Sequence, residues 1–228
     1  MKLKCKLHYL LVKNLGISKR DAQLLIQDSC VKINNIPTNK NIHITDFDEI
    51  QVNDKIIQVA QKPIYIAYYK PRGIECTLNE SIEHNLKHAI GIEETIFPLG
   101  RLDKESEGLL LLTNDGSICK KLLYEKYHVE KKYYVTVNKK ITTEFINALQ
   151  TGVIIMGKQT LPCKVHVIND TCFEIILIQG LNRQIRRMCY KHNYEVVNLK
   201  RIQFANYKLS TLQPGEWKSI QKEEILNF

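Results

Sequence analysis

An uninterrupted apolar run, GLLLLT at residues 108–113, restricts the possible folds of this chain more than any other feature. A strand with one solvated face alternates apolar and polar side chains, whereas a strand covered on both faces reads as a continuous apolar run. The run therefore predicts a central strand inside a layered fold. Asn114-Asp115-Gly116 follows it directly and predicts a turn. With 228 residues, 44% of them hydrophobic, the chain is long enough to bury such a strand.

Periodicity and turn residues predict the remaining elements and a division into two domains. We expect helices at 6–15, from residue 18 onward, at 117–125 and at 142–150, another that begins with Asn182 as its N-cap, and a short helix inside a polar loop at 79–95. We expect strands at 31–33, 49–52, 55–59, 64–69, 132–137 and 173–178. The change in pattern near residues 59–63 predicts a small domain at 1–60 and a larger one at 61–228.

The small domain contains the clearest local signals. Leucines at positions 7, 10, 11 and 15 lie on one helical face, and Gly16 is a typical stop for that helix. Ser18 is a favourable N-cap for a second helix, with Asp21 three residues later as in a capping box. Asn34-Asn35 predicts a tight turn after the strand at 31–33.

Charge is concentrated in blocks. Lys and Arg outnumber Asp and Glu by 33 to 24, a net charge of +9, and the excess lies at 1–32, 119–140 and 180–208. Separate basic blocks favour a surface that follows the charges of a polyanion, and either a nucleic acid or a membrane surface would fit. Lys19 and Arg20 occupy the first turn of a predicted helix, where cations are disfavoured unless a phosphate offsets them.

The seven cysteines form no Cys-x-x-Cys pair and no Cys/His cluster with zinc spacing. We therefore expect reduced thiols in a cytoplasmic protein. No apolar run reaches the roughly 18 residues of a membrane span, and the N-terminus lacks the apolar core of a secretory signal. The sequence predicts neither a membrane protein nor a secreted one.

Two segments could carry chemistry. GRLDKESEG at 100–108 places Asp103 beside Arg101 just before the buried strand, where rigid scaffolds often hold functional groups. The pattern alone slightly favours an ordinary capped turn, and a glycosidase carboxylate pair of Asp103 with Glu105 or Glu107 is a weak alternative. GLNRQIRRM at 180–188 places three arginines within one helical turn. By itself that segment also fits a basic helix lying on RNA or on a membrane.

Taken together, these segments resemble the RsuA/RluB/RluE/RluF branch of the bacterial rRNA pseudouridine synthases. GRLDKESEGLLLLTNDG at 100–116 and GLNRQIRRMC at 180–189 look like its signature segments, and KPRGI at 70–74 and EKKYYVTV at 130–137 match two more in the same order. Residues 6–57 resemble an S4 RNA-binding domain, which precedes the catalytic domain in this branch. The resemblance implies an α+β fold, in which a small S4 (α-L) domain is followed by a catalytic domain with a mixed, mainly antiparallel sheet flanked by helices.

The resemblance also implies a reaction and its residues. Enzymes of this branch isomerise uridine to pseudouridine on a nucleotide flipped out of the RNA, without a cofactor or a metal. Asp103 would be the nucleophile, Arg186 would pair with it, and Tyr133 would stack on the flipped base. Arg101 would fill the gap that the nucleotide leaves. Phosphate contacts are implied for Lys70, Arg72, Arg183 and Arg187 in the catalytic domain and for Lys19 and Arg20 in the S4 domain.

Within the branch, ITTEFINALQTGVII, PCKV and PGEW look most like the member that acts on uridine 2604 of 23S rRNA, near the peptidyl-transferase centre. Ribosomal RNA, free or in a large-subunit precursor, is therefore the expected partner of a monomer, and a tRNA target stays open. A related synthase with a different rRNA or tRNA target is the first alternative. An RNA-binding or ribosome-assembly factor without catalysis is the second. The joint presence of Asp103, Tyr133 and Arg186 argues against that second alternative.

Overall fold

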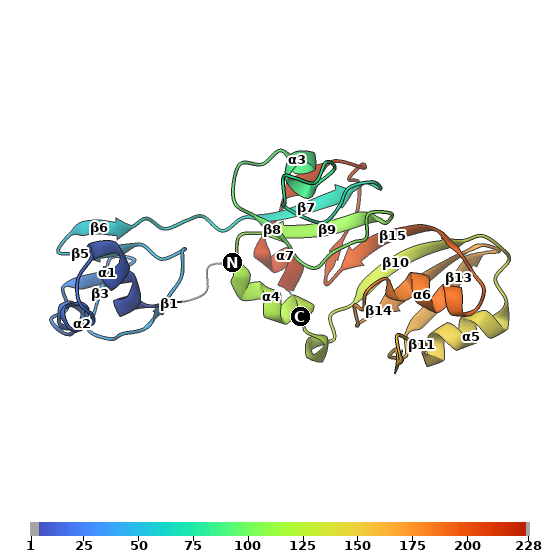
Figure 1. The fold of residues 1–228 in the computed structure, drawn as a ribbon, viewed down its shortest axis with the longest axis horizontal. Coiled ribbons are helices and arrows are strands. Elements are labelled where there is room, and N and C mark those ends of the chain that lie inside the picture. Colours follow the sequence, from blue (N-terminus) through green and yellow to red (C-terminus); the bar gives the residue numbers. More distant parts are fainter. Residues whose placement is uncertain (1–4, 227–228) are drawn as a thin grey trace. The chain divides into compact units, whose positions relative to one another are not determined.

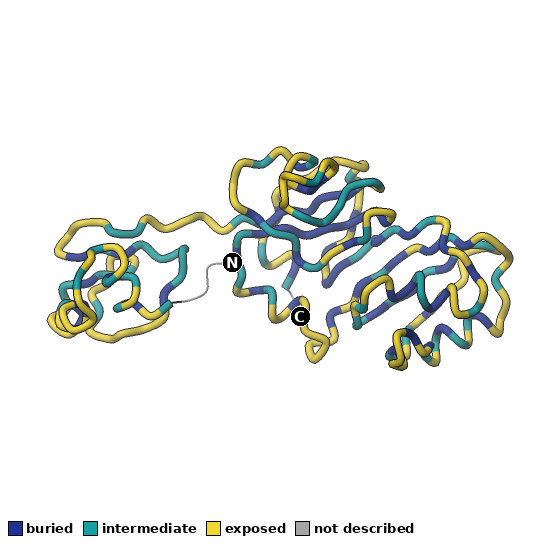
Figure 2. Tube along the Cα trace, in the orientation of Figure 1, coloured by how far each residue is buried: buried dark blue, intermediate teal, exposed yellow. Residues whose placement is uncertain are grey.

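The computed structural model describes residues 5–226, and the chain divides into two compact units, Met1–Pro63 and Ile64–Phe228 (Figure 1). Residues 59–63, at the end of the first unit, are exposed throughout and belong to no helix or strand (Figure 2). Within the described residues, no helix combines the length and the apolar character that crossing a membrane requires.

The first unit begins with two helices. Helix α1 (Leu7–Leu15) ends at Gly16, which takes a left-handed conformation with a φ of 66°. Helix α2 (Lys19–Gln27) follows, and the Ser18 hydroxyl oxygen accepts the Asp21 N–H at 3.1 Å while its hydrogen is donated to the Asp21 carboxylate at 2.7 Å. Both predicted helices and both of their predicted end signals are confirmed.

The helices of the first unit pack with short antiparallel strands. The main sheet has the order β3-β2-β5-β6, and β1 pairs separately with β4. The strands are β1 (Cys5–Lys6), β2 (Val31–Ile33), β3 (Ile36–Thr38), β4 (His43–Ile44), β5 (Ile50–Val52) and β6 (Lys55–Gln58). Asn34 and Asn35 both have positive φ and form the predicted turn between β2 and β3.

The second unit is built on a nine-stranded sheet with the order β13-β14-β10-β15-β9-β7-β17, in which β16 also pairs with β15 and β8 with β9. The strands are β7 (Tyr65–Lys70), β8 (Phe97–Pro98), β9 (Glu107–Thr113), β10 (Lys131–Val137), β13 (Lys164–Asn169), β14 (Cys172–Leu177), β15 (Val196–Phe204), β16 (Tyr207–Lys208) and β17 (Trp217–Ser219). Among these described strands, β9 and β15 run parallel and the other pairings are antiparallel. The expected mixed, mainly antiparallel sheet is confirmed.

Short elements surround this sheet. The helices are α3 (Leu86–Ile90), α4 (Cys119–Leu123), α5 (Thr143–Thr151), α6 (Gln184–Lys191) and α7 (Lys222–Leu226). Two 3-10 turns, Gly116–Ile118 and Glu125–Tyr127, flank α4, and β11 (Ile154–Ile155) and β12 (Lys158–Gln159) form a separate hairpin. The helices predicted inside 79–95, at 117–125 and at 142–150 correspond to α3, α4 and α5.

Strand β9 is buried on both faces, as its apolar run predicted. Leu110 and Leu112 belong to the core that includes α3, whereas Leu109 and Leu111 belong to the core that includes α4 and α7. Successive side chains of a strand point to opposite faces, so each face of β9 packs against a different set of helices. Figure 1 shows α3 on one side of β7 and β9, with α4 and α7 on the other.

A further core lies where α5 and α6 pack against β10 and β14 (Figure 1). The Phe145 ring of α5 meets the Phe173 ring edge-on, with centroids 5.8 Å apart, and stacks on Tyr194 at 3.8 Å. Ile185 and Met188 attach α6 to the same core. This packing fixes the position of the arginine-rich helix relative to the central strands.

The start of α6 differs from the prediction that Asn182 is its N-cap. The cap residue is Arg183, which has a left-handed φ of 51° and makes no side-chain capping hydrogen bond. Asn182 therefore lies one residue too early to cap. Its side-chain oxygen accepts a hydrogen bond from Arg187 Nη2 at 3.2 Å instead. The sequence also failed to predict β15, the strand that joins the two halves of the sheet.

Candidate active site

A cavity of about 730 Å³ opens in the second unit where the loop before β9, strands β10 and β15, and the loop before α6 converge. Its volume lies in the range of roughly 300–1,000 Å³ that is typical of small-ligand sites. The side chains that line it include Arg101, Asp103, Lys131, Tyr133, Arg183 and Arg201. Four of these are residues that the sequence predicted for the site.

The loop that carries Asp103 is fixed on both sides of that residue. The Leu102 N–H donates to the Cys76 sulfur at 3.3 Å, and the Leu102 side chain is buried in the core beneath α6. The Ser106 N–H donates to the Asp103 carbonyl oxygen at 3.0 Å. Because the backbone is held at these points, the Asp103 carboxylate keeps a defined place in the cavity wall, with 26% of its side-chain surface exposed.

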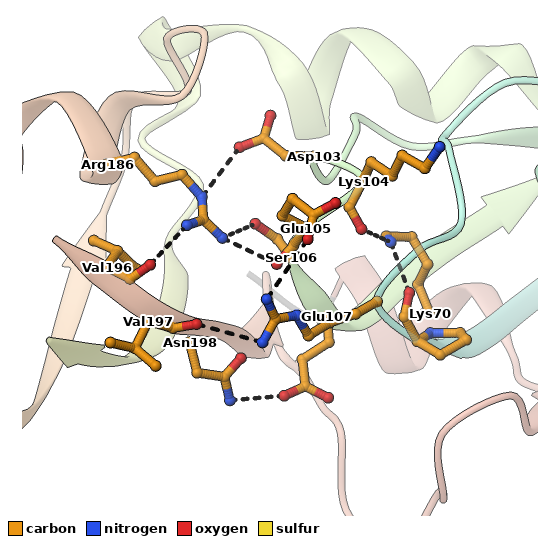
Figure 3. Close-up of polar contacts among 12 residues, drawn as sticks. Lys70, Asp103, Lys104, Glu105, Ser106, Glu107, Arg186, Val196, Val197 and Asn198 are labelled. Atoms are coloured by element: carbon orange, nitrogen blue, oxygen red, sulfur yellow. Dashed lines mark hydrogen bonds and ion pairs between the residues drawn. The ribbon is translucent and has the colours of Figure 1, made fainter. Parts of the chain in front are cut away.

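Arg186 approaches Asp103 from α6 with most of its donors already bonded (Figure 3). Nη1 donates to the Val196 carbonyl at 3.0 Å, and Nη2 donates to the Glu105 carbonyl at 3.0 Å and to the Ser106 hydroxyl at 3.3 Å. The remaining donor, Nε, is buried without a hydrogen bond and lies 3.9 Å from Asp103 Oδ2. The guanidinium is therefore clamped in an orientation that directs Nε to the carboxylate.

A second cation, Arg183, faces the same carboxylate. Its Nη1 lies 4.0 Å from Asp103 Oδ2, and its side chain is half exposed. The backbone of Arg183 at the start of α6 is left-handed, which is uncommon for a residue other than glycine. Burial, followed by the nearby charge of Arg183, lowers the pKa of Arg186, and the charge of Asp103 opposes that effect.

Tyr133 lies in the wall of the cavity on β10. It pairs directly with Arg201 on the neighbouring strand β15, and both side chains are buried, with 9% and 2% of their surfaces exposed. The structure thus brings together Asp103, Arg186 and Tyr133, the three residues predicted to be catalytic, from a loop, a helix and a strand that are far apart in the sequence.

Two predicted RNA contacts lie on or beside the loop that carries Asp103. Arg101 is exposed, lines the cavity and precedes Asp103 by two residues. Arg72 is half exposed; its Nη1 donates weakly to the Val197 carbonyl at 3.4 Å, and its Nη2 lies 3.6 Å from the Glu105 carboxylate. Both guanidinium groups remain available to a ligand.

The other predicted RNA contacts differ in accessibility. Arg187 is half-buried, and its Nε and Nη2 donate to the backbone and side-chain oxygens of Asn182 at 3.1 and 3.2 Å. These bonds hold the loop before α6. Lys19 and Arg20 are exposed in the first turn of α2, in the first unit.

The prediction that Lys70 contacts a phosphate is wrong, because this side chain is completely buried. Its ammonium donates to the carbonyl oxygens of Pro71 at 2.8 Å, Ile74 at 2.7 Å and Lys104 at 3.4 Å. Burial lowers the pKa of Lys70 to about 8. The residue connects the end of β7 to the loop of Asp103, so its role in this structure is to support that loop.

The sequence assigned no role to Lys131 or Arg201, although both line the cavity. The alternation of side chains along a strand could have indicated Lys131, because a residue two positions before Tyr133 lies on the same face of the strand as Tyr133. Arg201 carried a weaker signal as one of only seven arginines in a lysine-rich chain. Nothing in the local pattern indicated that it would be buried.

The Asp103 carboxylate, the Tyr133 ring and the guanidinium groups of Arg101, Arg183 and Arg201 line one cavity, and Arg186 adds a further guanidinium beside Asp103. Such a carboxylate can act as a nucleophile or a base toward a planar polar ring that stacks on Tyr133. Among residues 5–226, no group of three or more His, Cys, Asp or Glu side chains is placed to hold a metal ion. The surrounding positive charge would attract an anionic polymer.

Comparisons with known proteins agree with this chemistry. Residues 64–191 match the family model described as RNA pseudouridylate synthase. The chain is 39% identical over 213 residues to the dual-specificity RNA pseudouridine synthase RluF of Salmonella typhi. The aligned residues make up 92% of this chain and 74% of that relative. The chain is 31% identical over 217 residues to the ribosomal large subunit pseudouridine synthase B of Bacillus subtilis, covering 91% and 88%. The crystal structure of a pseudouridylate synthase, 26% identical, superposes with a TM-score of 0.64 over 96% of this chain and 97% of the other.

Proposed function

This chain belongs to the RNA pseudouridylate synthase family and is therefore an isomerase that modifies RNA, and from this premise we propose that it converts uridine to pseudouridine in ribosomal RNA with Asp103 as the nucleophile. The resemblance to the family that four sequence segments indicated is confirmed.

The isomerisation exchanges one bond of the base for another. The bond between N1 of uracil and C1′ of ribose breaks, the base turns, and a bond between C5 and C1′ forms. C5 loses its proton and N1 gains one, so no electrons are transferred to or from another molecule. The reaction therefore requires a nucleophile, a base that accepts the C5 proton and a site that holds the detached ring.

The observation that carries the proposal is the relationship between Arg186 Nε and Asp103 Oδ2, which are 3.9 Å apart. Among the described residues, Nε is the only nitrogen of Arg186 without a hydrogen-bond partner, because Nη1 is bonded to Val196 and Nη2 to Glu105 and Ser106. A fixed positive charge beside a partly buried carboxylate offsets the cost of burying its negative charge and holds the carboxylate in one orientation for attack. The flanking Arg183 adds to this effect.

Two further side chains fit a flipped nucleotide. Tyr133 offers an aromatic ring on which the extruded uracil would stack, and it lies in the cavity wall near Asp103. Extruding the nucleotide leaves a gap in the RNA stack and costs a few kcal/mol. Arg101 is exposed at the cavity and, in this proposal, fills that gap.

Phosphate contacts would surround the cavity and extend to the first unit. We assign Arg72, Arg183 and Arg187 to the RNA backbone in the catalytic domain, residues 61–228. We assign Lys19 and Arg20 to it in an S4-like domain, residues 1–60. The two cations at the first turn of α2 support this, since they lie at the positive end of a helix where a phosphate would be stabilised.

The names of the relatives favour large-subunit ribosomal RNA as the substrate, because one relative is a ribosomal large subunit synthase and another is a dual-specificity RNA synthase. We therefore propose a uridine of 23S rRNA, free or in a precursor particle, as the target of a cytoplasmic monomer. The position equivalent to uridine 2604 is the first candidate, on the strength of segments that include PGEW at 214–217. Another rRNA or tRNA uridine is the alternative.

Release of tritium from large-subunit rRNA labelled at uridine C5 tests the proposal. We expect release with the unmodified protein and none with Asp103→Asn, while both bind RNA within a few fold of each other. Asp170→Asn, which changes an exposed carboxylate paired with Lys140, serves as the control and should release tritium normally. Turnover by Asp103→Asn would refute the assignment of the nucleophile. If precursor particles, small-subunit rRNA and tRNA all gave no release while RNA bound tightly, an RNA-binding factor would be the better conclusion.

A further inference from the structure

The cavity wall contains two buried cations that the proposed reaction has not yet used. Lys131 and Arg201 line the cavity with 9% and 2% of their surfaces exposed. Charged side chains are rarely buried to this degree unless an opposite charge accompanies them. Their position beside Tyr133 therefore requires a physical explanation.

The strand register places these cations together. Arg201 on β15 lies directly opposite Tyr133 on β10. Lys131 precedes Tyr133 by two residues, so its side chain leaves β10 on the same face. Directly opposed side chains in antiparallel strands lie about 5 Å apart at Cβ, and diagonal neighbours lie within reach of long side chains. Lys131, Tyr133 and Arg201 thus form one continuous patch of the cavity wall.

The partners of these cations are neutral. Lys131 Nζ donates to the Val129 carbonyl at 3.3 Å and lies 5.4 Å from the centre of the Phe204 ring. Arg201 Nε donates to the Leu109 carbonyl at 2.7 Å, and the guanidinium carbon of Arg201 lies 5.0 Å from the centre of the Phe204 ring. The Nη2 atom of Arg201 is buried without a hydrogen bond. In the part of the chain that the structure describes, neither cation forms an ion pair with a carboxylate.

Burial and the nearby charge of Arg201 together lower the pKa of Lys131 to about 8. The two cations therefore repel each other in a poorly hydrated environment that offers them only carbonyl oxygens and one aromatic ring. Such an arrangement lowers the stability of the folded protein when the cavity is empty. It becomes favourable when negative charge arrives beside it.

The isomerisation generates negative charge on the base. If Asp103 attacks C1′, the electron pair of the N1–C1′ bond leaves with uracil and spreads onto its carbonyl oxygens. If Asp103 attacks C6 of the ring, the same oxygens receive the charge as an enolate. Fixed positive groups that face the place where charge develops stabilise a transition state strongly, because they need no reorganisation during the reaction.

We infer, on the basis of the proposed function, that Lys131 and Arg201 stabilise the negative charge that develops on the carbonyl oxygens of the flipped uracil ring. The location favours the base over an RNA phosphate as the anion. Phosphates of the flipped nucleotide stay with the RNA backbone at the opening of the cavity, where the exposed side chains of Arg101 and Arg183 lie. Lys131 and Arg201 are buried in the wall beside Tyr133, where the ring itself would be held.

The test compares Lys131→Met with Lys131→Arg and with Lys132→Met in the full-length chain. Lys132 is the neighbouring lysine on the opposite face of β10, paired with Glu174 at 3.2 Å, and it is the matched control. Three quantities are measured for each variant: the single-turnover rate of tritium release at saturating 5-tritiated rRNA, the dissociation constant for that RNA, and the melting temperature.

We expect Lys131→Met to lower the single-turnover rate by roughly 10²-fold, the effect typical of removing one charge-stabilising donor. RNA affinity should stay within twofold, and the melting temperature should be unchanged or higher because a buried, unpaired charge has been removed. Lys131→Arg should recover part of the rate, and Lys132→Met should match the unmodified protein in rate. Arg201→Met should lower the rate in the same way if it folds, and the inference does not depend on that variant.

Three results would overturn the inference. A Lys131→Met protein that reacts at the normal rate would remove Lys131 from the chemistry. A loss of RNA affinity with an unchanged rate at saturation would make it a phosphate contact. A lower melting temperature together with the slower rate would make it a structural support. If the unmodified protein itself released no tritium from any RNA, the proposed function would have failed instead, and the two failures are thereby distinguished.

Discussion

Gly108 lies directly opposite Arg201 in the parallel pair of β9 and β15, and the two backbones are so close that a Cβ atom on Gly108 would lie 2.7 Å from the Arg201 amide nitrogen. Gly108 also has a φ of 103°, which side-chain-bearing residues rarely adopt. The loop that carries Asp103 ends just before this contact, where β9 begins. The spacing of β9 and β15 therefore depends on the absence of a side chain at position 108.

Gly108→Ala should be strongly destabilising, by about 3 kcal/mol or more, because strain in the backbone adds to a collision with backbone atoms that cannot move aside. Denaturant unfolding measures the loss. Gly91→Ala is the control: Gly91 also has a positive φ, 67°, but open space surrounds its Cβ position. That variant should cost only about 1 kcal/mol. Equal losses at the two positions would contradict the role of the close approach.

Arg186→Lys should lower the rate of tritium release at saturating RNA by roughly 10²-fold or more, while RNA affinity changes little. A lysine cannot reach the Val196 and Glu105 carbonyls and Asp103 at once, as the planar guanidinium does. Arg183→Lys should lose less, since Arg183 is half exposed and lies 4.0 Å from the carboxylate. Similar losses for both variants would mean that charge alone matters and that the clamped orientation of Arg186 does not.

Lys70→Met and Arg72→Gln should affect RNA binding in different ways, although each removes one positive charge. Because the Lys70 ammonium is buried, we expect Lys70→Met to leave the slope of log RNA affinity against log salt concentration unchanged. The free energy of unfolding should fall by about 1–3 kcal/mol, because the carbonyl oxygens of Pro71 and Ile74 lose their donor. Arg72 is half exposed, and its loss should reduce that slope by about 1. Titrations at several salt concentrations separate the two. An equal reduction by Lys70→Met would show that Lys70 reaches RNA.

Asp115 should make the second unit sensitive to acid. Burial alone would raise the pKa of Asp115, but hydrogen bonds from Ser117, Tyr65 and Lys222 hold it at about 2, below the usual value of 3.8. Asp115 therefore binds a proton more readily in the unfolded chain than in the folded protein. Its ionised form stabilises the folded protein by about 2 kcal/mol; this stabilisation is fully present above pH 4 and is lost as the pH falls from 4 toward 2. Unfolding of the intact protein and of Asp115→Asn between pH 7 and pH 2 checks this. The variant should be less stable at pH 7 and should lose less between pH 4 and pH 2.

Much of the fold follows from local signals. The run at 108–113 predicted a strand covered on both faces, and Leu109 to Leu112 pack alternately into two different cores. The end signals of α1 and α2 are also local, because caps depend on residues within one turn. The motif segments predicted a site of Asp103, Tyr133 and Arg186; the structure places Asp103 and Tyr133 in the wall of one cavity and Arg186 beside Asp103.

The errors come from side chains whose surroundings are set by distant parts of the chain. Strand β15 was missed because its sequence, VVNLKRIQF, includes polar residues directed to both faces, among them the buried Arg201. The resemblance implied a phosphate contact for Lys70, yet three carbonyl oxygens from two loops surround its buried ammonium. The cap of α6 was displaced by one residue because the left-handed turn at Arg183 leaves no mark in the sequence.

The parallel contact of β9 with β15 also bears on how the enzyme matures as it is synthesised. Arg186 Nη2 and the Glu105 carbonyl are bonded although 81 residues separate them, and β15 follows α6 in the chain. During synthesis the loop of Asp103 is therefore made well before Arg186, and the contact between them forms in a late step that joins distant parts of the chain. Until β15 inserts between β9 and β10, the Val196 carbonyl that holds Arg186 is not in place, so the contact between Arg186 and Asp103 is completed only late in folding.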